Sequence, residues 1–379
     1  MTLLSPELLE RIHGRAAGYD RDNVFLTEDL DELKAAGYLK ALVPKELGGL
    51  GLSLLELTHE QSALAAAAPA TALAVNMHLV WTGVAKTLRD RGDDSLEFVL
   101  TDAVAGEVFA FAISEAGNDL VLFGSNTTAK PLPDGGYAFT GIKIFTSLSP
   151  AWTRLGLFGL DTESADAPKL VHAFVARDTG GITTLSDWDT IGMRASQSNS
   201  TKLDGAVAPA DRVVRRLTPG PNPDSLIFAI FANFEILVAA VYTGIGQRAL
   251  ELAVESVTGR VSARTGLTKD KDPVIRWKIA DAAIAQDALV PQLDALASDV
   301  DGLIERGNQW FRALVGIKSR ATKTAKYVVD QAVAVAGGAA FSNSSEIGRL
   351  YRDVLAGGFH PSNEDSVHTT VANALLGAE

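Results

Sequence analysis

The stretch Leu350-Tyr351-Arg352-Asp353-Val354-Leu355-Ala356-Gly357-Gly358-Phe359-His360-Pro361-Ser362-Asn363-Glu364 decides the fold of this chain. It lies in the last of four long segments with helical periodicity, and together these segments predict a C-terminal helical bundle. The segments cover about residues 225–260, 272–303, 308–338 and 345–377. Within the last one, we expect Ser362 to cap a helix whose first turn carries Glu364 and Asp365.

The segment that precedes the predicted bundle has the pattern of β-strands rather than helices. Thr218–Pro223 is rich in Pro and Gly and predicts a linker. Before it come short apolar runs separated by Gly and Pro turns, and Pro133–Gly136 has the composition of a hairpin turn. The runs are Phe109–Ile113, Tyr137–Phe145, Leu170–Ala176, Gly181–Leu185 and Ser200–Leu203. They predict a small β-barrel or β-sandwich.

The N-terminal part predicts helices again. Leu54–Leu79 is rich in Ala and Leu, and Val43–Gly51 is a turn punctuated by Gly. We therefore expect an α+β protein with an N-terminal helical domain over 1–107, a β-domain over 108–220 and a four-helix bundle over 221–379. Three such parts predict an enzyme with a ligand cleft where they meet.

Composition excludes several classes of function. The 379 residues are 47% hydrophobic, which is typical of a globular protein, and the net charge of −12 argues against a nucleic-acid surface. Cysteine is absent, so disulfides and thiol catalysis are excluded. His13, His59, His172 and His368 show no ligand spacing with one another, and no metal is expected. Without a long apolar run or leader, we expect a cytoplasmic protein that does not enter membranes.

Six motifs occur in an order that resembles the acyl-CoA dehydrogenase family over about residues 40–377. They are Val43–Gly51, Ile113–Asp119, Gly141–Ser147, Ile191–Ser196 with Val207–Pro209, Ala336–Gly338 and Leu350–Asp353. The resemblance implies an FAD enzyme, with the cofactor between the β-domain and the bundle, in a homodimer or homotetramer.

The resemblance also implies which residues hold the flavin. Ile113 and Ser114 would offer backbone N–H groups to the ring, Phe145 would pack on it, and Thr146 and Ser147 would lie near its reactive edge. Ser362 is expected to follow the catalytic position and contact the cofactor.

A further group implied by the resemblance would act on a neighbouring subunit's cofactor. Arg260, or alternatively Arg264, would pair with the FAD pyrophosphate, because guanidinium suits phosphate oxygens. Gly337 and Gly338 would let the backbone approach the dinucleotide closely.

The residue that performs the family's chemistry is replaced in this sequence. In the family, a Glu ten residues after the Tyr of Tyr-Arg-Asp removes a proton from an acyl thioester carried by CoA or an acyl carrier protein. Here that position is Pro361, which has no proton-transferring group. Some members carry the base on the first bundle helix instead. Glu235, in an apolar segment, is the candidate there, because an isolated buried carboxylate needs a role or a partner.

A second interpretation rests on histidine. His360 lies one residue before Pro361, and its near-neutral pKa suits proton transfer. Together with His78 and Ser147 it resembles the flavin monooxygenases built on this fold, in which such groups hydrogen-bond the flavin or the substrate.

Three functions therefore remain open. The first is an FAD-dependent dehydrogenase of acyl thioesters with a displaced base and an electron acceptor as partner. The second is a two-component monooxygenase that takes reduced flavin from a reductase. The third is a non-catalytic subunit that completes the FAD site of a sister chain.

Overall fold

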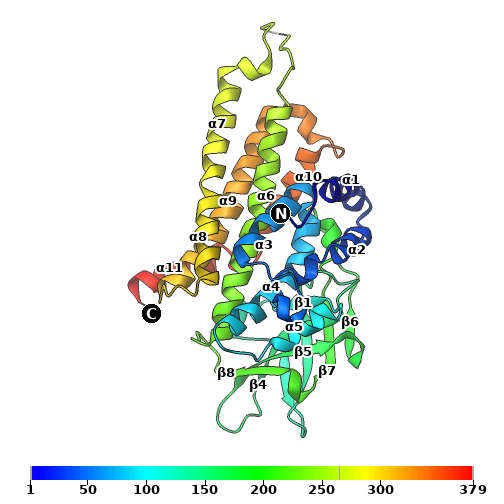
Figure 1. The fold of residues 1–379 in the computed structure, drawn as a ribbon, viewed down its shortest axis with the longest axis vertical. Coiled ribbons are helices and arrows are strands. Elements are labelled where there is room, and N and C mark those ends of the chain that lie inside the picture. The colour runs from blue at the N-terminus through cyan, green and yellow to red at the C-terminus, as the bar shows by residue number, and fades with distance from the viewer. Residues whose placement is uncertain (1, 264, 378–379) are drawn as a thin grey trace.

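The computed structural model describes residues 2–263 and 265–377. Helices lie at both ends of the chain and a β-sheet lies between them, as Figure 1 shows. The N-terminal helices are α1 (Pro6–Asp22), α2 (Thr27–Ala35), α3 (Leu54–Ala67), α4 (Pro69–Asp90) and α5 (Glu97–Val104). The C-terminal helices are α6 (Ser225–Glu255), α7 (Pro273–Asp287), α8 (Leu289–Asp301), α9 (Gln309–Ala336), α10 (Glu346–Val354) and α11 (Glu364–Leu376). The α+β order expected from the sequence is confirmed.

The middle of the chain forms one eight-stranded sheet in the order β6-β7-β3-β2-β4-β5-β8, with β1 paired to β4 in parallel. The strands are β1 (Phe109–Ala112), β2 (Thr128–Pro131), β3 (Tyr137–Lys143), β4 (Arg154–Asp161), β5 (Lys169–Ala176), β6 (Ile182–Thr184), β7 (Thr201–Ala208) and β8 (Val213–Leu217). The predicted turn at Pro133–Gly136 joins the antiparallel pair β2 and β3.

Two of the expected bundle helices are interrupted. The segment 272–303 forms α7 and α8, because Pro291 lacks an N–H and is tolerated only in the first turn of a helix. The segment 345–377 forms α10 and α11, and the connection between them contains Gly357, Gly358 and Pro361. That connection, residues 355–363, is called the α10–α11 loop below.

Helix α6 is the central helix of the bundle and packs against α3, α4 and α9. It is long and apolar enough to span a membrane by length and composition alone, yet 89% of its most apolar window is buried inside the fold. Helix α4 joins this core to the sheet, where a Cβ on Gly156 of β4 would lie only 2.3 Å from the ring of Trp81. The indole N–H of Trp81 donates to the Ala110 carbonyl at 3.0 Å. Glycine at 156 therefore lets α4 and β4 touch.

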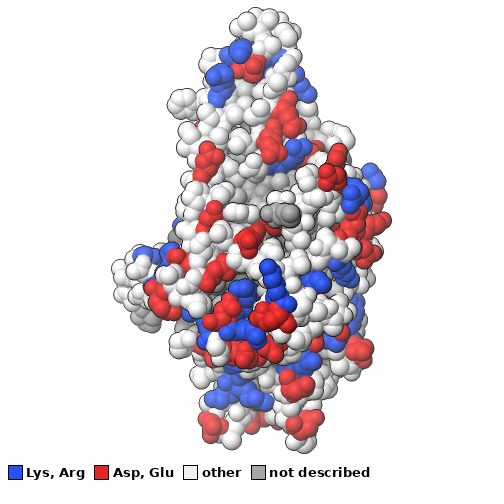
Figure 2. Space-filling view, in the orientation of Figure 1, with Lys and Arg blue, Asp and Glu red and all other residues white. Residues whose placement is uncertain are grey.

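Charged side chains of both signs are interspersed on the face shown in Figure 2. The described residues contain no group of three or more His, Asp or Glu side chains placed to hold a metal ion.

Candidate active site

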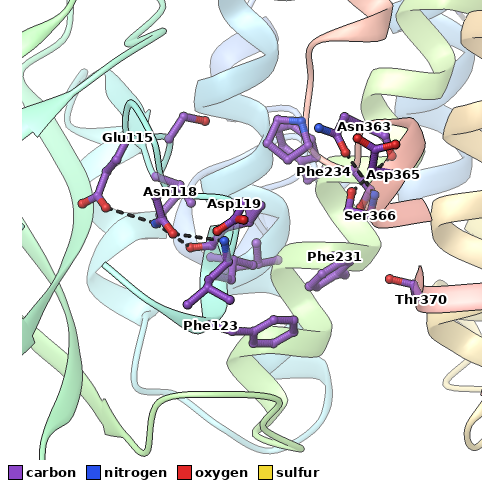
Figure 3. A pocket seen from close by; sticks show the side chains of 18 of the residues that line it. Glu115, Asn118, Asp119, Phe123, Phe231, Phe234, Asn363, Asp365, Ser366 and Thr370 are labelled. Carbon is purple, nitrogen blue, oxygen red and sulfur yellow. Dashed lines mark hydrogen bonds between the residues drawn. The ribbon is translucent and has the colours of Figure 1, made fainter. Parts of the chain in front are cut away.

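Two adjoining cavities lie where the sheet, α6 and the α10–α11 loop meet. The larger has a volume of about 590 Å³ and the smaller of about 370 Å³. Figure 3 shows the larger cavity. Six residues line both cavities, namely Phe111, Ser114, Phe145, Phe234, Phe359 and Pro361. Both cavities therefore meet at the position where the family's catalytic Glu is replaced by Pro361.

An aromatic and hydroxyl-bearing wall lines the smaller cavity. Phe145 is 49% exposed and has a φ of 57°, a left-handed conformation that non-glycine residues adopt mainly where the surroundings impose it. Its ring meets Trp188 edge to face at 6.1 Å between centroids. The Ser147 hydroxyl is 2.8 Å from that of Ser198. A flat apolar ring with polar atoms at its edge fits such a wall, so these residues suit a flavin.

The other residues predicted around the ring are placed as follows. Ile113 lines the larger cavity and Ser114 lines both. The Ile144 N–H donates to the Ser114 carbonyl at 2.9 Å, which joins the segment after β1 to the segment after β3. Thr146 is fully buried behind the cavity wall, and its hydroxyl oxygen has no hydrogen-bond partner among the described residues.

His360 lies in the α10–α11 loop and lines the smaller cavity. Its Nε2 is 2.9 Å from the Tyr242 hydroxyl, which reaches it from α6. Burial lowers the pKa of His360 to about 3, and the positive charge of Lys318 acts in the same direction. The ring is therefore neutral near pH 7 and can take part in hydrogen bonds without carrying a charge.

The expectation that His78 faces the flavin is not supported. His78 is fully buried in α4, its Nε2 is 2.7 Å from the Leu39 carbonyl, and its Nδ1 accepts from the Phe109 N–H at 3.1 Å. Both ring nitrogens are used by the backbone, and burial lowers the pKa of His78 to about 4. His78 therefore joins α4 to β1 and lies outside the residues that line the two cavities.

Glu235 lies in α6 and lines the larger cavity, although it is only 1% exposed. Its Oε1 accepts from the hydroxyl and the N–H of Ser362 at 2.9 and 3.3 Å. Its Oε2 is buried without a hydrogen-bond partner among the described residues. Burial raises the pKa of Glu235 to about 8, against the opposing effects of Lys318 and the Ser362 hydrogen bonds.

Lys318 of α9 was not predicted, and it holds the α10–α11 loop in place. Its Nζ donates to the carbonyls of Gly357, His360 and Ser362 at 3.1, 3.0 and 2.8 Å. Burial lowers the pKa of Lys318 to about 8, while the charge of Glu235 opposes that shift. A lone lysine on the apolar face of 308–338, four residues after Leu314, was the available signal.

The sequence suggested that Ser362 caps α11, and this prediction is wrong. The Ser362 hydroxyl donates to Glu235 instead. The side chain of Asn363 caps the helix instead and accepts from the Ser366 N–H at 3.1 Å. Glu364 and Asp365 do occupy the first turn. Ser362 lines the larger cavity, so its predicted contact with the cofactor stays a prediction.

Glu115 forms part of the larger cavity's wall, after β1. It makes an ion pair with the fully buried Lys143 at 2.5 Å and also accepts from the Ser125 hydroxyl at 2.7 Å. Backbone N–H groups of Asn126 and Thr127 donate to it at 2.6 and 3.1 Å. Burial alone would raise its pKa, but Lys143 and these hydrogen bonds outweigh burial and lower it to about 2.

Arg260, Gly337 and Gly338 lie away from these cavities. Arg260 follows α6 and the two glycines follow α9, at the end of the bundle opposite the sheet (Figure 1). All three are exposed, and a Cβ on either glycine would meet nothing within 4 Å. They do not contact the cavities of their own chain, so their action on a neighbouring subunit's cofactor stays a prediction. Arg264 lies outside the described residues.

Comparison with known proteins identifies this architecture. Residues 8–95 match the acyl-CoA dehydrogenase N-terminal domain and residues 236–364 match the acyl-CoA dehydrogenase C-terminal domain. An amino sugar nitrososynthase of Streptomyces peucetius is 31% identical over 374 residues, which cover 94% of this chain and 89% of that protein.

Two further relatives are a structure solved with a flavin and a named acyl-CoA dehydrogenase. A structure solved with FMN and dTDP-3-amino-2,3,6-trideoxy-4-keto-3-methyl-D-glucose has a TM-score of 0.88 and 28% identity, covering all of this chain (100%) and 93% of its own. The human mitochondrial short-chain specific acyl-CoA dehydrogenase is 25% identical, over 95% of this chain and 85% of its own. The chain therefore belongs to the acyl-CoA dehydrogenase family of flavin-dependent oxidoreductases.

Proposed function

We propose that this protein is a two-component flavin monooxygenase that oxidises the nitrogen of a small amine. The support is its similarity, over nearly its whole length, to an amino sugar nitrososynthase and to a structure solved with FMN and an amino sugar nucleotide. The similarity to an acyl-CoA dehydrogenase is lower, at 25% identity. The monooxygenase interpretation of the sequence is thus better supported than the dehydrogenase interpretation.

The observation that carries this proposal is Pro361 at the junction of the two cavities. A dehydrogenase needs a base at the substrate's α-carbon, and proline has no atom that accepts a proton there. The neighbouring side chain, His360, is neutral and held by Tyr242. Such a group can hydrogen-bond an oxygen-bearing or nitrogen-bearing substrate without adding charge.

The residues of this chain would hold and shield the flavin. Phe145 would pack on its ring, and the hydroxyl of Ser147, held by Ser198, would bond its edge. A bound reduced flavin supplies the two electrons with which molecular oxygen is activated. One oxygen atom enters an N–H bond of the amine as a hydroxyl, and the other leaves as water. The apolar walls of the cavities would exclude bulk water during this reaction.

We propose FMN as the flavin, in place of the FAD expected from the sequence. The support is the similar structure solved with FMN. A flavin reductase is the proposed electron donor. We also propose a homodimer or homotetramer, because α7 exposes large apolar side chains, with Trp277 75% accessible.

One observation favours a second function. Glu235 lines the larger cavity and has a buried carboxylate oxygen without a hydrogen-bond partner among the described residues, so it could act as the base of an acyl-thioester dehydrogenase. In that case the substrate would be an acyl-CoA or an acyl carrier protein, as first expected.

One experiment separates these functions. The purified chain is supplied with FMN, a flavin reductase, NADH and a panel of small amines, and oxygen consumption and N-hydroxy product are measured. We expect amine-dependent oxygen consumption with product formation. Anaerobic bleaching of the bound flavin by an acyl-CoA, without any amine oxidation, would overturn the proposal in favour of the dehydrogenase. A chain that binds no flavin in either redox state would favour the non-catalytic subunit.

A further inference from the structure

Glu235 differs from ordinary buried carboxylates because one of its two carboxylate oxygens has no hydrogen-bond donor among the described residues. Its Oε1 accepts both donors of Ser362, whereas Oε2 has no partner among the described residues and the side chain lines the larger cavity. A buried acceptor without a partner destabilises the fold, because it has lost its hydrogen bonds to water without gaining others. A ligand that donates a hydrogen bond to Oε2 would remove that penalty.

The charge of the larger cavity indicates what kind of donor would bind. Glu115, Asp119, Glu235 and Asp365 line it, and none of the described lining residues is Lys or Arg. Figure 3 shows Asp119 on the loop after β1, opposite Asp365 at the start of α11, with Phe231 and Phe234 between them. Lys143 already pairs with Glu115, so the wall favours a cation over an anion at the other three acidic positions.

The apolar part of the cavity indicates what the rest of the ligand resembles. Leu122, Phe123, Ile230, Phe231 and Phe234 form the wall next to Glu235. A ligand with an apolar body and one cationic end would bury its body against these side chains and place its charge at the carboxylate.

We propose that Glu235 binds the ammonium group of a primary amine through Oε2 and accepts one proton from it before oxidation. This inference rests on the proposed function for the class of substrate. In the proton transfer an N–H bond breaks, its electron pair stays on nitrogen as the lone pair, and the proton forms an O–H bond on Oε2. Only the neutral amine has a lone pair that can attack an electrophilic oxygen.

The surroundings of Glu235 suit this transfer. Burial raises the pKa of Glu235 to about 8, so its ionised form is a stronger base than an exposed Glu, and this ionised form is the one that accepts the proton. Lys318 is the cation whose field reaches Glu235, but its Nζ is turned to three loop carbonyls and leaves Oε2 free. His360, in the same loop, is neutral and adds no competing charge.

Calorimetric binding to the enzyme loaded with oxidised FMN tests the inference without turnover. The probes are hexylamine and benzylamine, with 1-hexanol and benzyl alcohol as uncharged counterparts. We expect Glu235→Gln to weaken amine binding by about tenfold or more, as for loss of a hydrogen bond to a charged group, and to leave alcohol binding nearly unchanged. Glu364→Gln is the matched control for general acidity, and it should change amine affinity less than about threefold because that side chain is exposed and lies outside the residues that line the two cavities.

A measurement on the unaltered enzyme covers the case in which Glu235→Gln does not fold. Hexyltrimethylammonium has the same charge as hexylamine but no N–H donor, so it should bind more weakly than hexylamine. Equal binding of both cations, equal losses for amine and alcohol in Glu235→Gln, or no preference for amines over alcohols would each overturn the inference.

The two proposals fail separately. Glu235-dependent amine binding without amine oxidation would overturn the proposed function alone. Amine oxidation with unaltered amine binding in Glu235→Gln would overturn the role of Glu235 alone.

Discussion

The molecule contains two buried Glu–Lys combinations, one in the sheet and one in the bundle. Glu115 and Lys143 are in contact at 2.5 Å, and both oxygens of Glu115 accept hydrogen bonds. Glu235 and Lys318 influence each other's pKa, but each forms its hydrogen bonds with the α10–α11 loop. Oε2 of Glu235 accepts no hydrogen bond from the described residues. The same two residue types are therefore fully satisfied in one place and half satisfied in the other.

This difference in hydrogen bonding indicates which carboxylate stabilises the fold and which is available for chemistry. Lys143 and several hydrogen bonds lower the pKa of Glu115 against the effect of burial, and both of its oxygens are engaged, so it has no capacity for a ligand. Burial raises the pKa of Glu235, and one of its oxygens is unengaged among the described residues, so it can bind a donor or accept a proton. Both line the larger cavity, so position in the cavity alone does not identify a functional carboxylate.

The largest expected effect comes from breaking the contact pair. Lys143→Met leaves the Glu115 carboxylate buried without its cation and should lower the free energy of unfolding by about 3–5 kcal/mol. Urea denaturation followed by circular dichroism measures it. The double variant Glu115→Leu with Lys143→Met should recover most of the loss, since an apolar pair of similar volume leaves no buried charge. A single variant as stable as the parent protein would show that the pair does not stabilise the sheet.

A smaller loss of stability is expected at the separated pair. Lys318→Met leaves the carbonyls of Gly357, His360 and Ser362 without their donor, at about 1–3 kcal/mol, and Glu235 avoids an unpaired charge by binding a proton. The rate of amine oxidation should also fall, even under conditions in which the variant stays folded, because the loop that carries His360 is no longer held by Lys318. Lys323→Met, on the same helix with an exposed ion pair to Glu364, is the matched control and should change neither quantity.

The two carboxylates should also give opposite dependences of stability on pH. The folded-state pKa of Glu115 is lowered to about 2 from 4.5, so its contribution is present above pH 4.5 and is lost as pH falls toward 2. The pKa of Glu235 is raised to about 8, so its contribution is present below pH 4.5 and is lost as pH rises through 8. Glu235→Gln should therefore gain stability relative to the parent protein between pH 5 and pH 8. A difference in free energy of unfolding that stays constant over this interval would contradict the raised pKa.

The smallest effect is expected from two serines that each donate to one carboxylate. Ser362→Ala removes a 2.9 Å hydrogen bond to Glu235 and should raise its pKa further, which moves the pH profile of amine oxidation toward higher pH. Ser125→Ala removes a 2.7 Å hydrogen bond to Glu115 and should leave that profile unchanged. Each substitution should lower the free energy of unfolding by about 1 kcal/mol. Equal shifts of the profile in both variants would remove the distinction between the two carboxylates.

Periodicity and spacing predicted most of the fold and part of the site. They located the bundle, the hairpin at Pro133–Gly136 and the linker before α6, because those features have local signals in the sequence. They missed β2, β4 and β8, and of these β4 is buried on both faces and shows no alternation. The resemblance to the family also indicated Glu235, Ser147 and His360, all of which line the cavities.

What the sequence could not provide was the pairing of distant groups. His78 was expected at the site because of its position in the family pattern, but its nitrogens are used by Leu39 and Phe109. Lys318 was missed because its partners are backbone carbonyls 39 to 44 residues away, which have no signature in the sequence. Hydrogen bonds to the backbone decide which polar side chains remain free for chemistry, and only the folded structure shows them.

Helix α6, apolar enough to resemble a membrane span, has a consequence for the synthesis of the protein. Its covering helices α3 and α4 precede it in the chain, whereas α9 follows it. When α6 leaves the ribosome, part of its apolar surface can already be sheltered, because domains tend to fold from the N-terminus during translation. The order of elements thus shortens the interval in which this helix is open to aggregation or to misrouting toward a lipid bilayer.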